Sequence, residues 1–110
     1  MCLLLGIDLG TSGLKAALFE ERGRMLSKSY SANRYIDSGR GRAEQDPQQW
    51  WQGCCRAIEQ AIAAAGVQAD RIAALGVCGF HHCPVFLDEA GKPVRPTIAV
   101  SYTHLRAHET

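Results

Sequence analysis

Five residues near the N-terminus have the types and the spacing needed to hold a phosphate group: Asp8, Gly10, Thr11, Ser12 and Lys15. Glycine permits positive φ and close approach of a ligand, so we expect the N–H groups of residues 10–13, with the two hydroxyls, to converge on one anion. Lys15 can neutralise that anion. Asp8 would repel a phosphate unless a hydrated Mg²⁺ lies between them.

The stretches on either side of these residues predict a strand, a turn and a second strand. Leu3–Ile7 is a continuous apolar run, typical of a strand buried on both faces, and a second apolar run ends at Phe19. Gly10 and Gly13 mark the turn between them. A plain structural hairpin with a glycine turn is the alternative. The P-loop pattern G-x-x-x-x-G-K-[ST] does not occur in the sequence.

Composition limits the classes of protein. The 110 residues suffice for one domain or part of one, and a 46% apolar content argues against disorder. A formal net charge of +1 gives no signal for nucleic-acid binding. Because no run is long and apolar enough to span a membrane and no basic leader precedes the first apolar segment, we expect a cytoplasmic protein without a membrane partner. The five cysteines are expected to be reduced.

The middle of the chain predicts a strand, a loop and a helix. Met25–Tyr30 is expected to be a third strand, and the polar, aperiodic Ser31–Gln45 a loop. Asp46 suits a helix N-cap, with Pro47 first in the helix, Gln49 as capping-box partner and Gly66 as the C-terminal cap. The core-facing positions are expected at helical spacing, at Trp51, Cys54, Ile58, Ile62 and Ala65. For the Trp50–Trp51 pair, stacking on a sugar ring is the alternative to a place in or beside the core.

The last third of the chain predicts more strands around a histidine-bearing loop. We expect strands at Ile72–Cys78, Val85–Leu87 and from Val94 onward. Side chains of the types that bind zinc lie within six residues around the loop between the first two of these strands: Cys78, His81, His82 and Cys83. So tight a cluster cannot easily surround a tetrahedral ion. Neutral imidazoles of His81 and His82 suit sugar hydroxyls, with a buried histidine bonded to backbone as the alternative.

The hairpin resembles the first phosphate motif of the actin-like ATPase superfamily, which includes actin, the Hsp70 chaperones, hexokinases and sugar kinases. Asp8, Gly10, Thr11, Ser12 and Lys15 match that motif. The resemblance implies an α/β, ribonuclease-H-like domain that is incomplete in this chain. Its mixed sheet would open with antiparallel strands, followed by a helix and further strands.

Two later motifs narrow the resemblance to the FGGY carbohydrate kinases. Residues 44–47 (EQDP) resemble the stretch that precedes a Trp-bearing helix in that family, and residues 79–83 (GFHHC) resemble its Gly-Gln-Met-His-Gly loop. His82 matches the family's histidine. Phe80, His81 and Cys83 depart from the usual Gln, Met and Gly, which puts the identity of the substrate in doubt. The resemblance covers residues 3–99.

The resemblance implies ATP-dependent phosphorylation of a hydroxyl on a sugar, polyol or sugar acid. ATP phosphates would bind at Asp8 and residues 10–15, with Mg²⁺ held by Asp8 through water, and the substrate at His81 and His82. The catalytic aspartate of the family lies farther along than this chain, so the fragment is expected to be inactive alone. A non-enzymatic actin-like ATPase or sugar-sensing regulator, a fragment without function, and a homodimer of the full-length protein stay open.

The last eleven residues, Val100 to Thr110, resemble the conceptual translation of a transposase-type sequencing adapter. The domain of interest is therefore expected to be residues 1–99, the N-terminal part of an FGGY kinase N-terminal domain. Residues 100–110 are expected to be a non-native tail, and we leave them out of the fold prediction.

Overall fold

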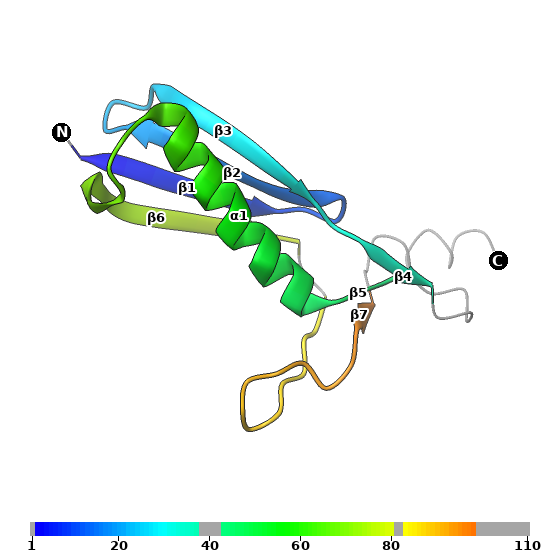
Figure 1. Ribbon diagram of the computed structural model, residues 1–110. Coiled ribbons are helices and arrows are strands. Elements are labelled where there is room, and N and C mark those ends of the chain that lie inside the picture. The colour runs from blue at the N-terminus through cyan, green and yellow to red at the C-terminus, as the bar shows by residue number, and fades with distance from the viewer. Residues whose placement is uncertain (1, 38–42, 81–82, 99–110) are drawn as a thin grey trace.

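The computed structural model describes residues 2–37, 43–80 and 83–98, which form two sheets and one long helix (Figure 1). The elements in chain order are β1 (Leu3–Leu9), β2 (Gly13–Glu20), β3 (Met25–Ala32), β4 (Tyr35–Asp37), β5 (Ala43–Gln45), α1 (Pro47–Ala65), a 3₁₀ turn η1 (Ala69–Arg71), β6 (Ile72–Gly79) and β7 (Thr97–Ile98). The predicted tail at 100–110 lies outside the described residues.

The larger sheet is mixed, as the sequence predicted. Its strand order is β3-β2-β1-β6. The first three strands are antiparallel neighbours joined by tight turns, whereas β6 runs parallel to β1. A parallel neighbour requires a crossover connection, and α1 provides it by crossing one face of the sheet before the chain enters β6 (Figure 1).

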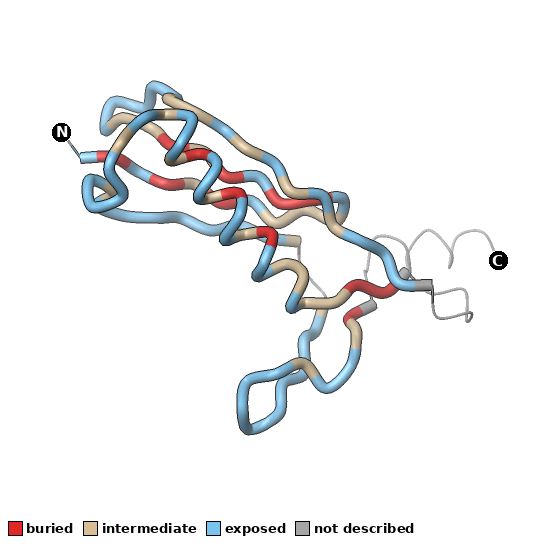
Figure 2. The backbone as a smooth tube through the Cα atoms, viewed as in Figure 1, coloured by how far each residue is buried: buried red, intermediate tan, exposed pale blue. Residues whose placement is uncertain are grey.

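The core lies between α1 and the first two strands. Red segments of Figure 2 alternate with other colours along β1 and β2 on the sheet that α1 crosses. The buried residues of these strands alternate along the chain: Leu3, Leu5, Ile7, Leu14, Ala16 and Leu18. This is the period-2 pattern of a sheet packed on one face. The helix contributes Ala57 and Ala61, which are fully buried.

The expectation that the first strand is buried on both faces was wrong for the described chain, and β6 is also largely exposed. Leu4 is 38% exposed, and Leu75 and Val77 of β6 are 61% and 66% exposed. The physical reason is that α1 covers only one face and lies mainly over β2 and β3. The opposite face, and the β6 edge of the sheet, are uncovered in the described residues.

Helix α1 begins and ends where its sequence predicted. The Asp46 carboxylate accepts a hydrogen bond from the Gln48 N–H at 2.9 Å, and Pro47 follows as the first helical residue. Gly66 adopts φ 68° and donates its N–H to Ile62 at 3.0 Å, which closes the helix in the left-handed conformation that favours glycine. The capping-box role of Gln49 was wrong, because its side chain binds the backbone of Ala32 and Arg34 in place of its own helix.

The buried face of α1 is made of small residues, so the prediction that Trp51 faces the core was wrong. Trp51 is 67% exposed, whereas Gly53, Ala57 and Ala61 are buried. Cys54, Ile58, Ile62 and Ala65 flank the core and are partly buried, as their spacing predicted. A large side chain cannot enter this face because the helix lies close against β3.

Serines of β3 match these small residues one to one. Ser27 Oγ donates to the Ala61 carbonyl at 2.6 Å, and Ser29 Oγ donates to the Ala57 carbonyl. A Cβ on Gly53 would lie 2.7 Å from Ser31 Oγ. Two strand residues and four helical residues span similar lengths, roughly 6.6 and 6.0 Å, so the two series stay in step.

The regions predicted as loop and strand around the smaller sheet need correction. Ser31–Gln45 is not all loop, because β3 continues to Ala32 and β4 pairs with β5. Val85–Leu87 is not a strand and makes a single bridge, from Leu87 to Pro93. The strand expected from Val94 is confined to β7, which pairs with β5. These segments are too short for a hydrophobic period to reveal.

The close contact between α1 and β3 predicts a strong penalty for added volume. Ala57→Leu should lower the free energy of unfolding by about 1–3 kcal/mol, since the side chain would force the helix away from β3. The matched control is Ala64→Leu, the same change at an exposed position of the same helix. Urea denaturation followed by tryptophan fluorescence measures both. Equal stabilities of the two variants would contradict this packing.

Candidate phosphate-binding site

The predicted phosphate residues lie at one end of the larger sheet, where β1 and β2 meet. Asp8 and Lys15 are directly paired across the two antiparallel strands. Both are exposed and line the same depression on the face that α1 does not cover. Opposite residues of an antiparallel pair place their side chains on one face about 5 Å apart, so a carboxylate and an ammonium stand side by side at the start of the turn.

Glycine is required in this turn for space, not for backbone conformation. The turn is closed by a hydrogen bond of 2.9 Å from the Gly10 N–H to the Gly13 carbonyl. Neither Gly10 nor Gly13 uses the positive φ that glycine permits, since the described glycines with positive φ are Gly23, Gly66 and Gly91. A Cβ on Gly13 would lie 2.3 Å from the Tyr30 ring, which covers this residue.

Three successive carbonyls of the turn accept hydrogen bonds from residues in β3, in β5 and in the link between β3 and β4. Asn33 Nδ2 donates to the Gly10 carbonyl at 2.8 Å, and the Asn33 N–H donates to the Ser12 carbonyl at 2.9 Å. Gln45 Nε2 donates to the Thr11 carbonyl at 2.9 Å. Tyr30 adds a bond of 3.0 Å from its hydroxyl to Ser12. These three carbonyls of the turn are therefore held by side chains and one backbone N–H.

This arrangement sets the direction of the peptide N–H groups. In a trans peptide the C=O and the following N–H point in opposite directions. Because the carbonyls of residues 10–12 point toward Asn33 and Gln45, the N–H groups of residues 11–13 point away from them. A row of N–H groups oriented in one sense is an arrangement that can bind an anion.

A third side chain, Cys78, joins Asp8 and Lys15 in the same row across the sheet. Cys78 pairs with Asp8 in the parallel register of β1 and β6, and its Sγ donates to Asp8 Oδ1 at 3.3 Å. This hydrogen bond is the main reason that the pKa of the Cys78 thiol is raised, and slight desolvation and the negative charge of Asp8 add to it. The thiol therefore stays protonated and orients one oxygen of the carboxylate.

The donor set suits a hydrated magnesium ion. Mg²⁺ prefers oxygen ligands, keeps several of its waters and binds through one or two carboxylates together with substrate phosphates. Asp8 offers an exposed carboxylate beside the anion-binding turn. The described residues contain no group of three or more His, Cys, Asp or Glu side chains that could enclose a metal alone, so a bound ion would need water and phosphate oxygens as well.

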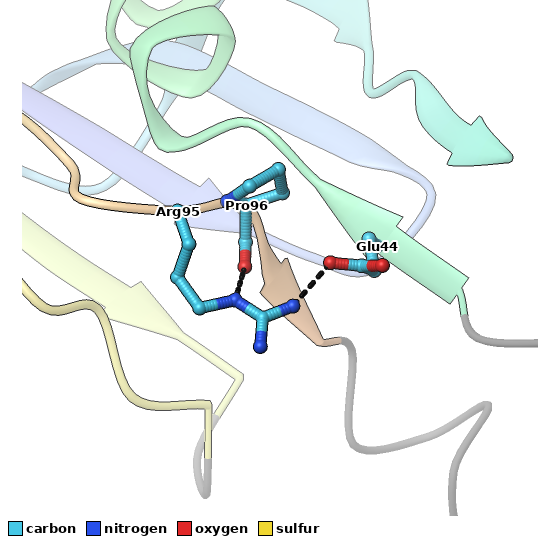
Figure 3. Close-up of polar contacts among 3 residues, drawn as sticks. All are labelled: Glu44, Arg95 and Pro96. Atoms are coloured by element: carbon cyan, nitrogen blue, oxygen red, sulfur yellow. Dashed lines mark hydrogen bonds and ion pairs between the residues drawn. The ribbon is translucent and has the colours of Figure 1, made fainter. Parts of the chain in front are cut away.

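The smaller sheet fixes the EQDP segment beside the turn. Gln45 is fully buried in β5, between β4 and β7, and its carbonyl oxygen Oε1 accepts a hydrogen bond from Trp50 Nε1 at 2.6 Å. Its neighbour Glu44 is 4% exposed and pairs with Arg95, whose Nε also donates to the Pro96 carbonyl at 2.9 Å (Figure 3). A buried carboxylate needs such a partner.

Comparison with known proteins places this geometry in a family. The profile of the "FGGY family of carbohydrate kinases, N-terminal domain" matches residues 3–110. The chain belongs to this family. The fold and the family that the sequence motifs implied are therefore confirmed.

Curated relatives and a solved structure of the FGGY family agree. The chain is 36% identical over 96 residues to the xylulose kinase of Streptomyces rubiginosus. This alignment covers 87% of the chain and 19% of the relative. The chain is 33% identical over 95 residues to glycerol kinase 2 of Thermotoga maritima. That alignment covers 86% of this chain and 19% of the relative. A xyloylose kinase from Brucella ovis superposes with a TM-score of 0.78 at 34% identity, over 87% of this chain and 20% of that one.

The FGGY chain spans about a fifth of the length of the curated relatives that it matches. The sequence predicted two further site residues, His81 and His82, and these lie outside the described residues. No helix in the described ranges is long and apolar enough to cross a membrane.

Sequence reasoning missed the residues that hold the turn from behind. Asn33 and Gln45 lie in the segment that was expected to be loop, and their role depends on strands of only a few residues. The available signal was the unusual concentration of amide and aromatic side chains between residues 30 and 50. Nothing in their spacing indicates that they face the glycine turn.

The bond between Cys78 and Asp8 predicts a change in thiol reactivity. Asp8→Asn removes the carboxylate, so the pKa of Cys78 should fall toward its ordinary value. At a fixed pH near neutrality, alkylation of Cys78 by iodoacetamide should then become faster. Peptide mapping by mass spectrometry measures the rate, with Cys55, exposed on α1, as the internal reference. A slower or unchanged rate at Cys78 would show that this contact does not form.

Proposed function

We propose that the FGGY chain is the phosphate-holding part of an ATP-dependent carbohydrate kinase. The complete enzyme would transfer the γ-phosphoryl group of ATP to a hydroxyl of a sugar, polyol or sugar acid. The observation that carries the proposal is the pairing of Asp8 with Lys15 at the start of a turn whose carbonyls are all bound from behind. Family membership supports the same reaction class.

The turn supplies contacts for the phosphates. The N–H groups of residues 11–13 can donate to phosphate oxygens, and the hydroxyls of Thr11 and Ser12 lie in the same segment. Lys15 adds a positive charge that can follow the charge developing on the transferred group. Fixed donors of this kind stabilise a transition state because they need little reorganisation during the reaction.

Asp8 is proposed to hold Mg²⁺ through a water molecule. Bound there, the ion would neutralise the phosphates, which would otherwise repel the Asp8 carboxylate. The Cys78 thiol, kept protonated, directs one carboxylate oxygen and leaves the other for the ion's water shell. Asp8 in this role binds and orients, and it does not take a proton from the substrate.

The uncovered face has space for the nucleotide next to these groups. Gly6 and Gly76 are paired across β1 and β6, and a Cβ on Gly76 would meet nothing within 4 Å. With Ala17 they form a floor of small residues in the depression that Asp8, Lys15 and Cys78 also line. A flat, open floor beside an anion-binding turn suits the phosphate end of a nucleotide.

Phosphoryl transfer needs a base for the substrate hydroxyl, and this base would belong to the rest of the enzyme. The substrate hydroxyl loses its proton to that base, its oxygen bonds to the γ-phosphorus, and the bond to the β-phosphate oxygen breaks to release ADP. The proposed catalytic aspartate lies beyond this chain, so residues 1–110 alone should not turn over.

We propose that His81 and His82 contact substrate hydroxyls and that the enzyme is cytoplasmic. The named relatives favour a ketose or a polyol as substrate.

Removing either charge at the turn should impair catalysis without unfolding the enzyme. In the complete kinase that carries this chain, we expect Lys15→Ala to lower kcat by roughly a hundred- to a thousandfold, the usual effect of losing one fixed electrostatic contact. Asp8→Asn should cause a loss at least as large, because the charge that orders Mg²⁺ disappears. A coupled assay for ADP release with xylulose or glycerol measures both.

Two control variants separate a site effect from a surface effect. Lys28→Ala removes an exposed lysine from the neighbouring strand β3, and Asp70→Asn an exposed aspartate from η1. Both should keep near-normal turnover, and sugar binding without ATP should survive all four changes. Near-normal turnover of folded Asp8→Asn enzyme would contradict the proposed function and favour a purely structural turn.

A further inference from the structure

The side-chain amide of Gln45 connects the glycine turn to the first turn of helix α1. Nε2 donates to the Thr11 carbonyl at 2.9 Å, and Oε1 accepts from Trp50 Nε1 at 2.6 Å. Gln45 has no solvent exposure, so neither bond can be exchanged readily for a bond to water. Loss of either bond would leave a buried polar group without a partner.

The two partners determine which way the amide faces. An indole N–H can only donate and a backbone carbonyl can only accept. The amide therefore places its oxygen toward Trp50 and its NH₂ toward Thr11, and the reverse orientation would lose both bonds. The peptide that joins Thr11 and Ser12 is thus held with its N–H directed away from Gln45, toward the proposed phosphate.

The Trp50 ring packs against Phe80, and Phe80 in turn binds the hairpin. The two rings meet edge-on, with centroids 5.5 Å apart and planes at 89°. The Phe80 N–H donates to the Leu9 carbonyl at 3.0 Å, just before the turn. Gln45, Trp50 and Phe80 therefore connect two backbone carbonyls of the hairpin, those of Thr11 within the turn and Leu9 just before it.

We propose that Gln45 is a positioning residue for phosphoryl transfer, which orients the Thr11–Ser12 peptide so that its N–H meets a phosphate oxygen. The inference rests on the proposed function of the turn. It assigns Gln45 a specific effect on nucleotide binding and turnover, beyond the stability that any buried, hydrogen-bonded amide contributes.

Gln49 provides a matched comparison within the same chain. Its Nε2 also donates to a backbone carbonyl, that of Ala32 at 3.1 Å, and its Oε1 also accepts a hydrogen bond, from the Arg34 N–H at 3.2 Å. Within the part of the chain that the structure describes, neither hydrogen bond of its side chain reaches the turn. Gln45→Met and Gln49→Met thus remove the same amide chemistry, but only the first removes a donor to residues 10–12.

The test uses the complete kinase that carries this chain. Binding of AMP-PNP with Mg²⁺ is measured by calorimetry, and kcat and KM are measured with xylulose or glycerol as acceptor. Gln45→Met should weaken AMP-PNP binding and lower kcat, each by roughly ten- to a hundredfold, with KM for the acceptor within about twofold of wild type. Gln49→Met should change none of these, whatever it does to the melting temperature.

A second variant tests the inference if Gln45→Met fails to fold. Trp50→Phe keeps an aromatic ring against Phe80 but removes the donor that fixes the amide, so it should reduce the same two parameters by a smaller factor. If Gln45→Met or Trp50→Phe behaves like Gln49→Met, the positioning role is wrong and the proposed function still stands. If wild-type enzyme binds no AMP-PNP, the proposed function fails, and the inference fails with it.

Discussion

The close approach of helix α1 to strand β3 is the constraint on which the rest of the structure depends. Gly53, Ala57 and Ala61 allow it, and serines of β3 donate hydrogen bonds across the contact. Since β5 precedes the helix directly, the position of the helix also fixes Gln45. The packing of the middle of α1 against β3 therefore determines where the helix begins, and so it places the Gln45 side chain against the glycine turn.

The two faces of the larger sheet have different roles. The face under α1 carries the core, in which residues of the hairpin strands β1 and β2 pack against the helix. The other face carries Asp8, Lys15 and Cys78 in one row across three strands. The buried amide of Gln45 and the half-buried amide of Asn33 hold the turn from the packed side, so its N–H groups are available on the other. This division lets a rigid scaffold present a polar site without burying unpaired charge.

The sequence predicted what depends on local patterns. The hairpin and the N-cap and C-cap of α1 follow from short-range signals: glycines, an Asp-Pro pair and apolar runs. The helix face was mispredicted because Trp51 counts as apolar in a periodicity argument, whereas the neighbouring β3 admits only small residues. Asn33 and Gln45 were missed as site residues because their contacts join segments distant in sequence, through strands too short to show a period.

The most direct test of the account is a crystal structure of the complete kinase with AMP-PNP and Mg²⁺. We expect phosphate oxygens on the order of 3 Å from the backbone nitrogens of residues 11–13. Mg²⁺ should lie one water molecule from Asp8, and Gln45 should still be bonded to the Thr11 carbonyl. A nucleotide whose phosphates bind elsewhere, with residues 10–13 making no contact to them, would contradict the account.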